Sequence, residues 1–259
     1  MNPQQAAEQL WHAWRQGDKL TALPPSLRPA SLADGYAIQA CLPAVSGQTV
    51  FGWKIAATNP TGQAHIGVDG PIGGRLLASQ IIAAGGSASM QSNKMAVAEA
   101  EFAFRLAHAL PPRDEPYSEA EVLAAIGSLH PAIELPDSRF ADFATAGAAQ
   151  LAADNACAHL FVLGDAVTAD WRTLDLAAQP VKLIINDETV TTGQGADVLG
   201  SPLSAMTWLA NQAALLGEGL QAGQVVTTGV CGSPCPIKAD DHIVADFGAL
   251  GRVSCRLTA

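Results

Sequence analysis

Hydrophobic residues recur at helical spacing in the first part of the chain. Apolar side chains lie three or four positions apart up to Trp14, and Gly17 follows as a residue type that commonly ends a helix. After a proline-rich connector, Ser31 with Asp34 three positions later predicts the start of a second helix. We therefore expect residues 1–45 to form an N-terminal helical segment that packs on the rest of the protein.

Beyond residue 46 the pattern changes to short apolar runs separated by glycine-rich and polar turns, which is typical of strands. Two of these runs flank the polar turn at 186–188 and predict a β-hairpin. The expected strands cover residues 50–56, 95–107, 130–135, 159–163, 181–185, 189–192, 224–229, 242–247 and 252–257.

Helices interrupt these strands without forming a regular βαβ repeat. Ser118 and Glu121 form a capping box that predicts a helix through Leu129. The other segments without strand character are helices expected at 143–153 and 202–216 and a loop expected at 56–74. Because strands outnumber helices, we expect residues 46–259 to form one β-rich α+β domain.

Composition narrows the class of protein further. The chain has 259 residues, of which 49% are hydrophobic, and its mean hydropathy is +0.18, so it can bury a substantial core. The formal net charge is -10 and no cluster of lysine and arginine occurs. Without such a cluster to neutralise phosphates, we expect no nucleic-acid partner.

Targeting and redox features point to the cytoplasm. The first residues lack the basic start and apolar stretch of a secretory signal, and no apolar segment reaches the roughly 18 residues that a membrane helix requires. The five cysteines are scattered, and Cys231 and Cys235 have no second pair or nearby histidine to complete a zinc site. We expect five reduced thiols in a cytoplasmic protein with no membrane partner.

Two acidic residues stand out in the apolar run at 95–104. Glu99 and Glu101 are separated by one alanine, so on a strand both carboxylates project from the same face. One interpretation is a solvated face with the apolar residues inward. The other is a cation site, since Mg²⁺ and Mn²⁺ prefer such oxygen ligands. Glu134, again between apolar neighbours, adds a third carboxylate and favours the second interpretation.

Lys54 is the main candidate for acid–base chemistry. It lies in a strand-like segment with little other charge, where apolar neighbours and a metal would depress its pKa. The alternative is a surface lysine whose stem covers apolar side chains. His65, between two glycine-containing turns near Lys54, is a further candidate for the site.

Several common catalytic motifs are missing. The sequence has no Gly-x-Ser-x-Gly elbow and no phosphate-binding P-loop, and its glycine-rich segment at 70–74 lacks the spacing of a dinucleotide-binding fingerprint.

A set of segments in a fixed order carries a family resemblance. They are Gly52-Trp-Lys-Ile55, Gly67-Val-Asp69, Ala98-Glu-Ala-Glu-Phe-Ala-Phe104, Ala132-Ile-Glu-Leu-Pro-Asp-Ser-Arg139, Ala153-Asp-Asn-Ala156, Thr192-Gly193, Val198-Leu-Gly-Ser-Pro-Leu203, Trp208-Leu-Ala-Asn211, Gly229 and Phe247-Gly-Ala-Leu-Gly-Arg-Val-Ser254. With them the chain resembles the 2-keto-4-pentenoate hydratase / 4-oxalocrotonate decarboxylase family, within the fumarylacetoacetate hydrolase superfamily. The match extends over nearly the whole chain.

The resemblance implies a fumarylacetoacetate hydrolase-like fold, a mixed β-roll or sandwich with peripheral helices. It also implies one Mg²⁺ or Mn²⁺ held by three acids, which fall on Glu99, Glu101 and Glu134. The family's lysine falls on Lys54, and an aspartate falls on Asp69 as a second catalytic candidate. Members usually assemble as homo-oligomers.

Residues in or near the family segments are candidates for binding substrate. They are His65, Arg75, Asp154, Asn155 and Thr192. The chain departs from the family pattern at 56–62 and 70–74 and at Cys157-Ala158, where a pair of serines is typical. Because these stretches are expected to line the substrate pocket, they put the identity of the substrate in question.

The resemblance implies a lyase of aromatic hydrocarbon catabolism that adds water to a 2-hydroxydienoate such as 2-hydroxypenta-2,4-dienoate and gives a 4-hydroxy-2-oxo acid. The first alternative is decarboxylation of a 2-oxo-dioate, for which Arg75 or Arg139 could bind the second carboxylate. The second alternative, of another class, is a catalytically silent assembly partner of a pathway enzyme. The presence of all three acids and of Lys54 counts against it.

Overall fold

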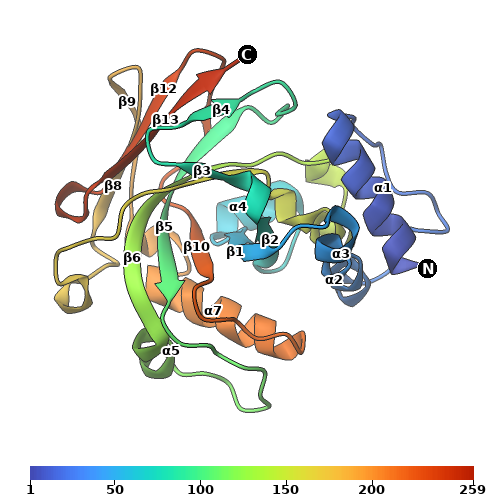
Figure 1. The fold of residues 1–259 in the computed structure, drawn as a ribbon, viewed down its shortest axis with the longest axis horizontal. Coiled ribbons are helices and arrows are strands. Elements are labelled where there is room, and N and C mark those ends of the chain that lie inside the picture. The colour runs from blue at the N-terminus through green and yellow to red at the C-terminus, as the bar shows by residue number, and fades with distance from the viewer.

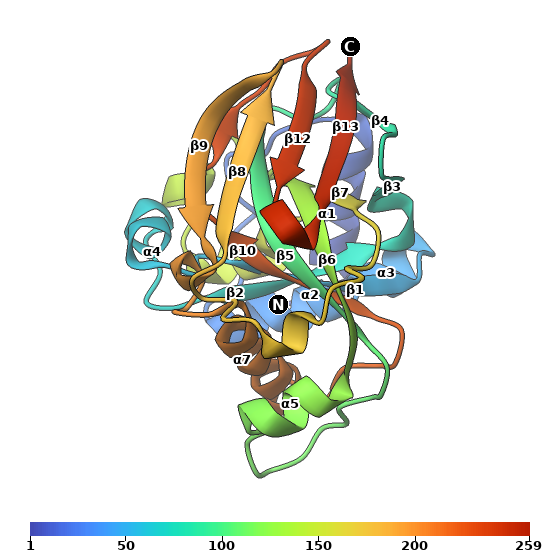
Figure 2. The same cartoon turned by 90° about the vertical axis from the view of Figure 1, so that its left-hand side faces the viewer.

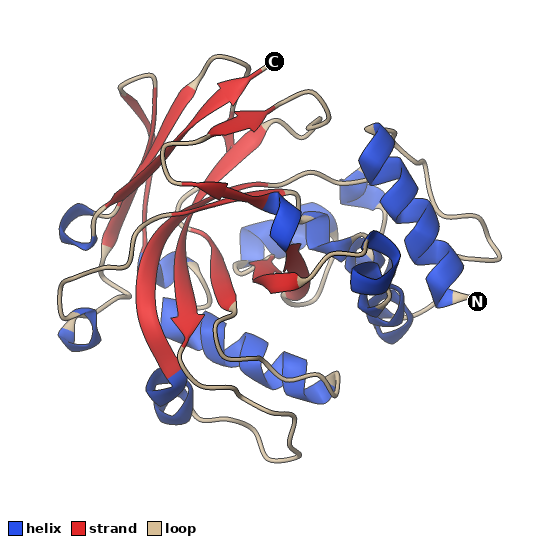
Figure 3. Cartoon of the chain, in the orientation of Figure 1, coloured by secondary structure: helices blue, strands red, loops and turns tan.

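The computed structural model describes all 259 residues of the chain. Figure 1 shows strands curling around one side of the molecule, with the N-terminal helices gathered on the other side. Colouring by secondary structure makes the same division visible, with further helices below the strands (Figure 3). This is the β-rich α+β architecture expected from the sequence.

The larger sheet carries the candidate site. Its strands are β1 (Val50–Ala56), β2 (Ile72–Leu77), β3 (Ile81–Ala83), β5 (Val97–Leu106), β6 (Ile126–Leu135), β7 (Leu160–Leu163), β10 (Val225–Val230) and β11 (Cys235–Pro236). The order is β2-β1-β10-β5-β6-β7-β3, with β11 paired to β5. The pairs β1–β10 and β3–β7 are parallel and the other pairs are antiparallel.

The smaller sheet packs on β5 and β6 and buries their outer face (Figure 2). Its strands are β4 (Ser87–Ser89), β8 (Pro180–Ile185), β9 (Glu188–Gln194), β12 (His242–Asp246) and β13 (Arg252–Thr258), in the order β4-β13-β12-β8-β9. Phe102 of β5 meets Phe247 in an edge-to-face contact, with ring centroids 4.9 Å apart. The predicted hairpin is confirmed as β8–β9, whose turn residues Asn186 and Asp187 both have positive φ, as primed turns require.

Seven α-helices surround the sheets. They are α1 (Pro3–Gln16), α2 (Leu32–Ala40), α3 (Leu42–Ser46), α4 (Pro60–Ile66), α5 (Glu119–Ala125), α6 (Ala148–Ala153) and α7 (Pro202–Leu215). The short 3₁₀ helices are η1 (Ala78–Gln80), η2 (Phe143–Thr145), η3 (Asn155–Cys157), η4 (Trp171–Thr173), η5 (Gly195–Asp197) and η6 (Gly248–Leu250). Both expected N-terminal helices are confirmed: Gly17 ends α1 at φ 71°, and Ser31 caps α2 in a capping box with Asp34.

The N-terminal helices share a small core with the segment that follows β6. Leu10 of α1 and Ile38 of α2 pack with Phe140 and Ala153. We propose that residues 1–45 form a helical segment that packs through this shared core on one catalytic unit, residues 46–259.

Two local expectations are wrong. The helix that begins at the Ser118 capping box ends at Ala125, and Ile126 starts β6. Apolar residues at 126 and 129 fit both the helical and the strand pattern, and pairing with β5 decides for the strand. The segment 143–153 is not one helix, because Gly147, at φ 84°, separates η2 from α6.

The segment expected as a loop at 56–74 is also partly ordered into regular elements. It contains α4, which Asn59 caps by accepting a hydrogen bond from the Gly62 N–H at 2.8 Å, with Pro60 in the first turn. Its last residues, from Ile72, belong to β2. The wall of the cavity described below is therefore built from defined backbone.

All five cysteines are free thiols, as expected. None of the helices has the combination of length and apolarity that crossing a bilayer demands.

Candidate metal centre and cavity

Two neighbouring strands bring three carboxylates together. Glu99 and Glu101 project from one face of β5, and Glu134 lies directly opposite Glu99 in the antiparallel register of β6. One oxygen from each of the three lies within 4.8 Å of the others. We call these residues the glutamate cluster.

The cluster faces away from the second sheet. Ala100, Phe102 and Phe104 point to the opposite face of β5, where the smaller sheet and Trp171 cover them. Glu101 and Glu134 are nonetheless 0% exposed. Lys54 of β1 lies against Glu134, and Thr227 and Gly229 of β10 bind Glu101. A solvated strand face therefore does not describe these two residues.

The hydrogen bonds of the cluster are incomplete. The Thr227 hydroxyl and the Gly229 N–H of β10 both donate to Oε2 of Glu101, the N–H at 2.9 Å. Oε1 of Glu101 and both carboxylate oxygens of Glu134 accept no hydrogen bond. Buried acceptors without donors are costly, so such a set is typical of a site built for a ligand.

Lys54 contributes the one positive charge beside the cluster. Its ammonium Nζ lies 3.1 Å from Oε1 of Glu134 and donates a hydrogen bond to the Ala156 carbonyl at 3.0 Å. The residue is 3% exposed, with its ammonium held between Glu134 and the Ala156 carbonyl. A surface lysine is therefore not an adequate description of Lys54.

The charges shift the pKa values of the group. Burial, followed by the charge of Glu134, raises the pKa of Glu99 to about 7 and that of Glu101 well above its usual value. Burial acts to lower the pKa of Lys54, but the glutamate charges outweigh it and raise that pKa. The sequence predicts a lowered pKa for Lys54, and the structure gives the opposite direction. The expectation included the positive charge of a metal ion, whereas here the three carboxylates act on Lys54 without such a charge.

The donor set fits a hard divalent cation. Three carboxylates beside one ammonium leave two surplus negative charges when all groups are ionised. Oε1 of Glu101 and Oε2 of Glu134 have no donor, and Oε1 of Glu134 faces only the Lys54 ammonium at 3.1 Å. Hard oxygen ligands of the kind that Mg²⁺ and Mn²⁺ prefer are therefore available. The residues present therefore suit the metal that the family resemblance implies.

A cavity of about 740 Å³ opens beside the cluster. Its polar lining includes Lys54, Thr58, Asn59, Thr61, His65, Glu99, Thr192, Asp197 and Ser233, and its apolar lining includes Ile66, Met95, Val97, Phe143 and Val230. Two of the predicted substrate-binding residues lie on this wall: His65, at the end of α4 with its ring edge against Phe143, and Thr192 on β9. Lys54 is the only lysine or arginine on the lining.

The other predicted site residues lie away from the cavity wall. Asp69 is exposed just after α4 and is not on the lining, so its catalytic role stays a prediction. Arg75 is buried behind β1, where its guanidinium stacks on Trp53 at 4.6 Å and binds Gln39 and Glu218.

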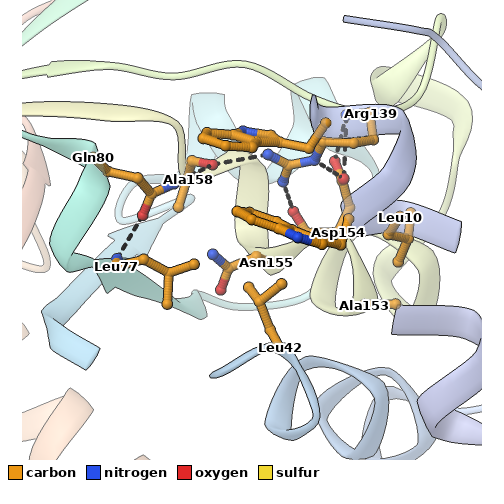
Figure 4. Close-up of a pocket in the computed structure, with 11 residues that line it drawn as sticks. Leu10, Leu42, Leu77, Gln80, Arg139, Ala153, Asp154, Asn155 and Ala158 are labelled. Carbon is orange, nitrogen blue, oxygen red and sulfur yellow. Dashed lines mark hydrogen bonds and ion pairs between the residues drawn. The ribbon is translucent and has the colours of Figure 1, made fainter. Parts of the chain in front are cut away.

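Asp154 and Asn155 take part in a second polar group, which Figure 4 shows beside a small cavity under α1. The Asp154 carboxylate accepts hydrogen bonds from the Ser138 hydroxyl at 2.6 Å and from the backbone and side chain of Arg139. The Asn155 amide binds the backbone of Arg75. We call Asp154 and Arg139 the Arg139–Asp154 pair.

Residues on β10 support the site. From the sequence, Gly229 is named among the family segments without a role, and Thr227 is not named. Thr227 lies opposite Lys54 in the parallel register, and its hydroxyl binds Glu101. Gly229 has φ 100°, and a Cβ there would lie 2.2 Å from the Thr58 hydroxyl oxygen. A threonine pair followed by glycine at the end of a strand is a weak signal, and only the sheet order brings it to the cluster.

Comparison with known proteins places the chain in a family. Residues 66–258 match the family model described as fumarylacetoacetate (FAA) hydrolase C-terminal. The chain is 34% identical over 255 residues to the 2-keto-4-pentenoate hydratase of Burkholderia vietnamiensis (strain G4 / LMG 22486), covering 97% of this chain and 96% of the relative. It is 32% identical over 259 residues to that of Paraburkholderia xenovorans (strain LB400), covering 98% and 95%.

A solved structure shows the same fold. The 4-oxalocrotonate decarboxylase from Pseudomonas putida G7, complexed with magnesium and adipate, superposes with a TM-score of 0.89 at 28% identity, covering 98% of this chain and 97% of that chain. The sequence resemblance is thereby confirmed over essentially the whole length. The chain belongs to the 2-keto-4-pentenoate hydratase / 4-oxalocrotonate decarboxylase family of the fumarylacetoacetate hydrolase superfamily.

Proposed function

We propose that the chain is a metal-dependent hydratase, a lyase that adds water to a short 2-hydroxydienoate or its 2-oxo-enoate tautomer and releases a 4-hydroxy-2-oxo acid. The observation that carries this proposal is the buried Lys54 ammonium beside a carboxylate cluster with free oxygens, at the wall of a cavity. The hydratase names of the relatives support the same reaction class.

Glu99, Glu101 and Glu134 would hold one Mg²⁺ or Mn²⁺. When bound, such a cation supplies Lewis-acid stabilisation of negative charge on the oxygens of a 2-oxo acid. The magnesium in the related decarboxylase structure supports the choice of a divalent ion.

Lys54 would move the protons of the reaction. In the first stage the dienol loses its O–H proton and gains a C–H bond at C5, which gives the 2-oxo-3-enoate. In the second stage the hydroxyl of water bonds to C4 and a proton bonds to C3, so that substrate and one water account for every atom of the product. The Lys54 ammonium can donate to the carbon chain because it lies on the cavity wall, and the Ala156 carbonyl and Glu134 fix its direction.

The decarboxylase alternative requires a cation for a second carboxylate. Arg75 and Arg139, the two candidates from the sequence, are buried against Glu218 and Asp154, and neither lines the cavity. Apart from Lys54 and His65, the lining consists of apolar residues such as Met95 and Phe143, of neutral polar groups and of the acids Glu99 and Asp197. This lining favours a substrate with one carboxylate and a neutral tail, and therefore favours hydration.

We also propose that the chain assembles as a homo-oligomer, as the resemblance implies. A catalytically silent assembly partner would have no need of a buried lysine beside three acids, so we favour an active enzyme that does not depend on a partner pathway enzyme for its site.

Absorbance spectroscopy tests the reaction. Purified chain freed of metal and then supplied with Mg²⁺ or Mn²⁺ should remove the ultraviolet absorbance of 2-hydroxypenta-2,4-dienoate and yield the 4-hydroxy-2-oxo acid. It should leave a 2-oxo-dioate such as 2-oxohex-3-enedioate nearly untouched. Release of carbon dioxide from the dioate with no turnover of the dienoate would make the chain a decarboxylase, and no metal-dependent change with either would refute the proposal.

A further inference from the structure

Three successive residues beside the active site have left-handed backbone conformations. Asn155, Ala156 and Cys157 have φ values of 58°, 51° and 61°, and none is glycine. A left-handed conformation is unfavourable for an L-residue, because its Cβ comes too close to the following carbonyl oxygen. Such a turn persists only where its surroundings hold it, and strain of this kind concentrates at functional sites.

The Asn155 side chain fixes the turn to strand β2. Its Oδ1 accepts a hydrogen bond from the Arg75 N–H at 2.6 Å, and its Nδ2 donates to the Arg75 carbonyl at 2.7 Å. The backbone is equally close: a Cβ on Gly74 would lie 2.3 Å from the Asn155 carbonyl oxygen. Since Gly74 is the partner of Lys54 in the β1–β2 register, the turn is fixed directly beside the strand position of Lys54.

Arg139 holds the two flanks of the same turn. Its guanidinium donates to the carbonyl of Asp154, which precedes the turn, and to the carbonyl of Ala158, which follows it, the latter at 2.8 Å. Figure 4 shows this fork between the two flanking residues. The Asn155 amide is thus occupied by backbone, and the Arg139 guanidinium is occupied by two backbone carbonyls and the Asp154 carboxylate. Neither residue is on the lining of the cavity of about 740 Å³.

This arrangement directs one backbone carbonyl toward Lys54. Ala156, at the centre of the turn, presents its oxygen to the Lys54 ammonium at 3.0 Å. We propose that the left-handed turn at 155–157 is a device that aims Lys54 into the cavity, and that Asn155 is its positioning residue. The inference rests on the proposed function, in which Lys54 carries the protons.

The variant Asn155→Gly removes the two side-chain hydrogen bonds to Arg75 without making the left-handed backbone conformation less accessible. Glycine adopts positive φ without strain, so this variant keeps the conformation available and removes both hydrogen bonds to Arg75. Because displacement of a reacting group by about 1 Å can cost on the order of 100-fold in rate, we expect kcat to fall roughly 10- to 100-fold. KM should stay within about threefold and Mn²⁺ affinity should be unchanged, since substrate and metal contacts are intact.

Asn211 offers a matched control. Its amide makes the same two-bond clamp, accepting from the Tyr117 N–H at 2.6 Å and donating to the Tyr117 carbonyl at 3.1 Å, on α7 away from the cavity lining. Asn211→Ala should lower the thermal midpoint but leave kcat of the folded enzyme unchanged. If Asn155→Gly does not fold, Asn155→Asp, which keeps the acceptor and loses the donor, takes its place.

A second readout does not depend on turnover. In protein carrying an isotope label at the lysine Nζ, nuclear magnetic resonance should show a slowly exchanging Lys54 ammonium, assigned by its loss in Lys54→Met. In Asn155→Gly this signal should shift and exchange at least about tenfold faster, because the carbonyl partner is displaced. The proposal is overturned if the signal is unchanged, if kcat of the variant stays near that of wild type, or if Asn211→Ala loses kcat equally. Absence of turnover by the wild-type chain would refute the proposed function, while the lysine signal would still decide the role of Asn155.

Discussion

The molecule contains two buried groups of charged side chains, and they differ in how their polar atoms are satisfied. In the Arg139–Asp154 pair, one carboxylate faces one guanidinium. The carboxylate also accepts hydrogen bonds from the Ser138 hydroxyl and from a backbone N–H. In the glutamate cluster, three carboxylates face one ammonium, and three carboxylate oxygens accept no hydrogen bond.

This difference separates structural burial of charge from functional burial. A satisfied pair fixes backbone and needs nothing further. A cluster with surplus charge and free acceptors is stable only when something else compensates it, which a divalent cation and a 2-oxo acid would do. Burial alone would not have separated the two groups, because Glu101 and Asp154 are both nearly inaccessible.

The largest expected effect comes from replacing Lys54, the proposed proton carrier. With Mn²⁺ present, Lys54→Met should lower kcat by roughly 10²- to 10⁴-fold, the usual contribution of a positioned acid–base group. Mn²⁺ binding should persist because the carboxylates remain. Steady-state kinetics with Lys182→Met, an exposed lysine on β8, as control measure this effect. Near-normal turnover by Lys54→Met would remove Lys54 from the mechanism.

The next effect concerns the satisfied pair. Asp154→Asn leaves the buried Arg139 without a counter-charge and places an amide donor against its N–H groups. The free energy of unfolding should fall by about 3 to 5 kcal/mol, as for other broken buried pairs. Urea denaturation of the metal-free protein measures the loss. A change below about 1 kcal/mol would show that the pair is not the structural element described here.

His159, which packs against Trp14 beside the same pair, should make stability depend on pH. Burial lowers the pKa of His159 to about 4, and its Nδ1 accepts no hydrogen bond. Below the unfolded-state pKa of about 6.5 the unfolded chain takes up a proton that the folded chain does not. Between pH 6.5 and 4 the free energy of unfolding should therefore decline by about 3 kcal/mol from this residue.

Denaturation of wild type and His159→Gln across this range isolates the effect. The difference between the two proteins should shrink or change sign steadily as the pH falls. A constant difference from pH 7 to 4 would show that His159 titrates normally in the folded chain.

The smallest effect has the opposite sign to that of Asp154→Asn. Glu101→Gln keeps an acceptor for Thr227 and Gly229 and offers an N–H to the neighbouring carboxylates. It also replaces a carboxyl group whose ionisation burial and the neighbouring glutamates oppose, as its raised pKa shows. Without metal, this variant should be more stable than wild type by about 1 kcal/mol. Glu188→Gln on the exposed strand β9 should change stability by less than about 0.5 kcal/mol. Destabilisation of the metal-free protein by Glu101→Gln would mean that the cluster, too, is built for structure.

Features encoded within a few neighbouring residues could be predicted from the sequence. The capping boxes at Ser31 and Ser118, the hairpin of β8 and β9, and the same-face placement of Glu99 and Glu101 all follow from local spacing. The end of α5 could not be predicted in this way, because the apolar pattern after residue 125 suits a helix and a strand equally.

Contacts between residues far apart in the chain could not be predicted from the sequence, and the site depends on several of them. Arg75 has its charge partner at Glu218, and nothing near either residue in the sequence indicates this. The register of β6 on β5, which brings Glu134 opposite Glu99, is likewise visible only in the sheet. The family segments identified Asn155 as a candidate residue but not its contacts. Its side chain binds the Arg75 backbone, which holds it behind the cavity wall.

Titration with Mn²⁺, followed by the electron paramagnetic resonance signal of the free ion, tests the central claim most directly. The wild-type chain should bind one Mn²⁺, and Glu101→Gln, folded and at least as stable without metal, should bind it at least about tenfold more weakly. Equal binding by the two proteins, or no binding by wild type at millimolar Mn²⁺, would contradict the assignment of the glutamate cluster as a metal centre.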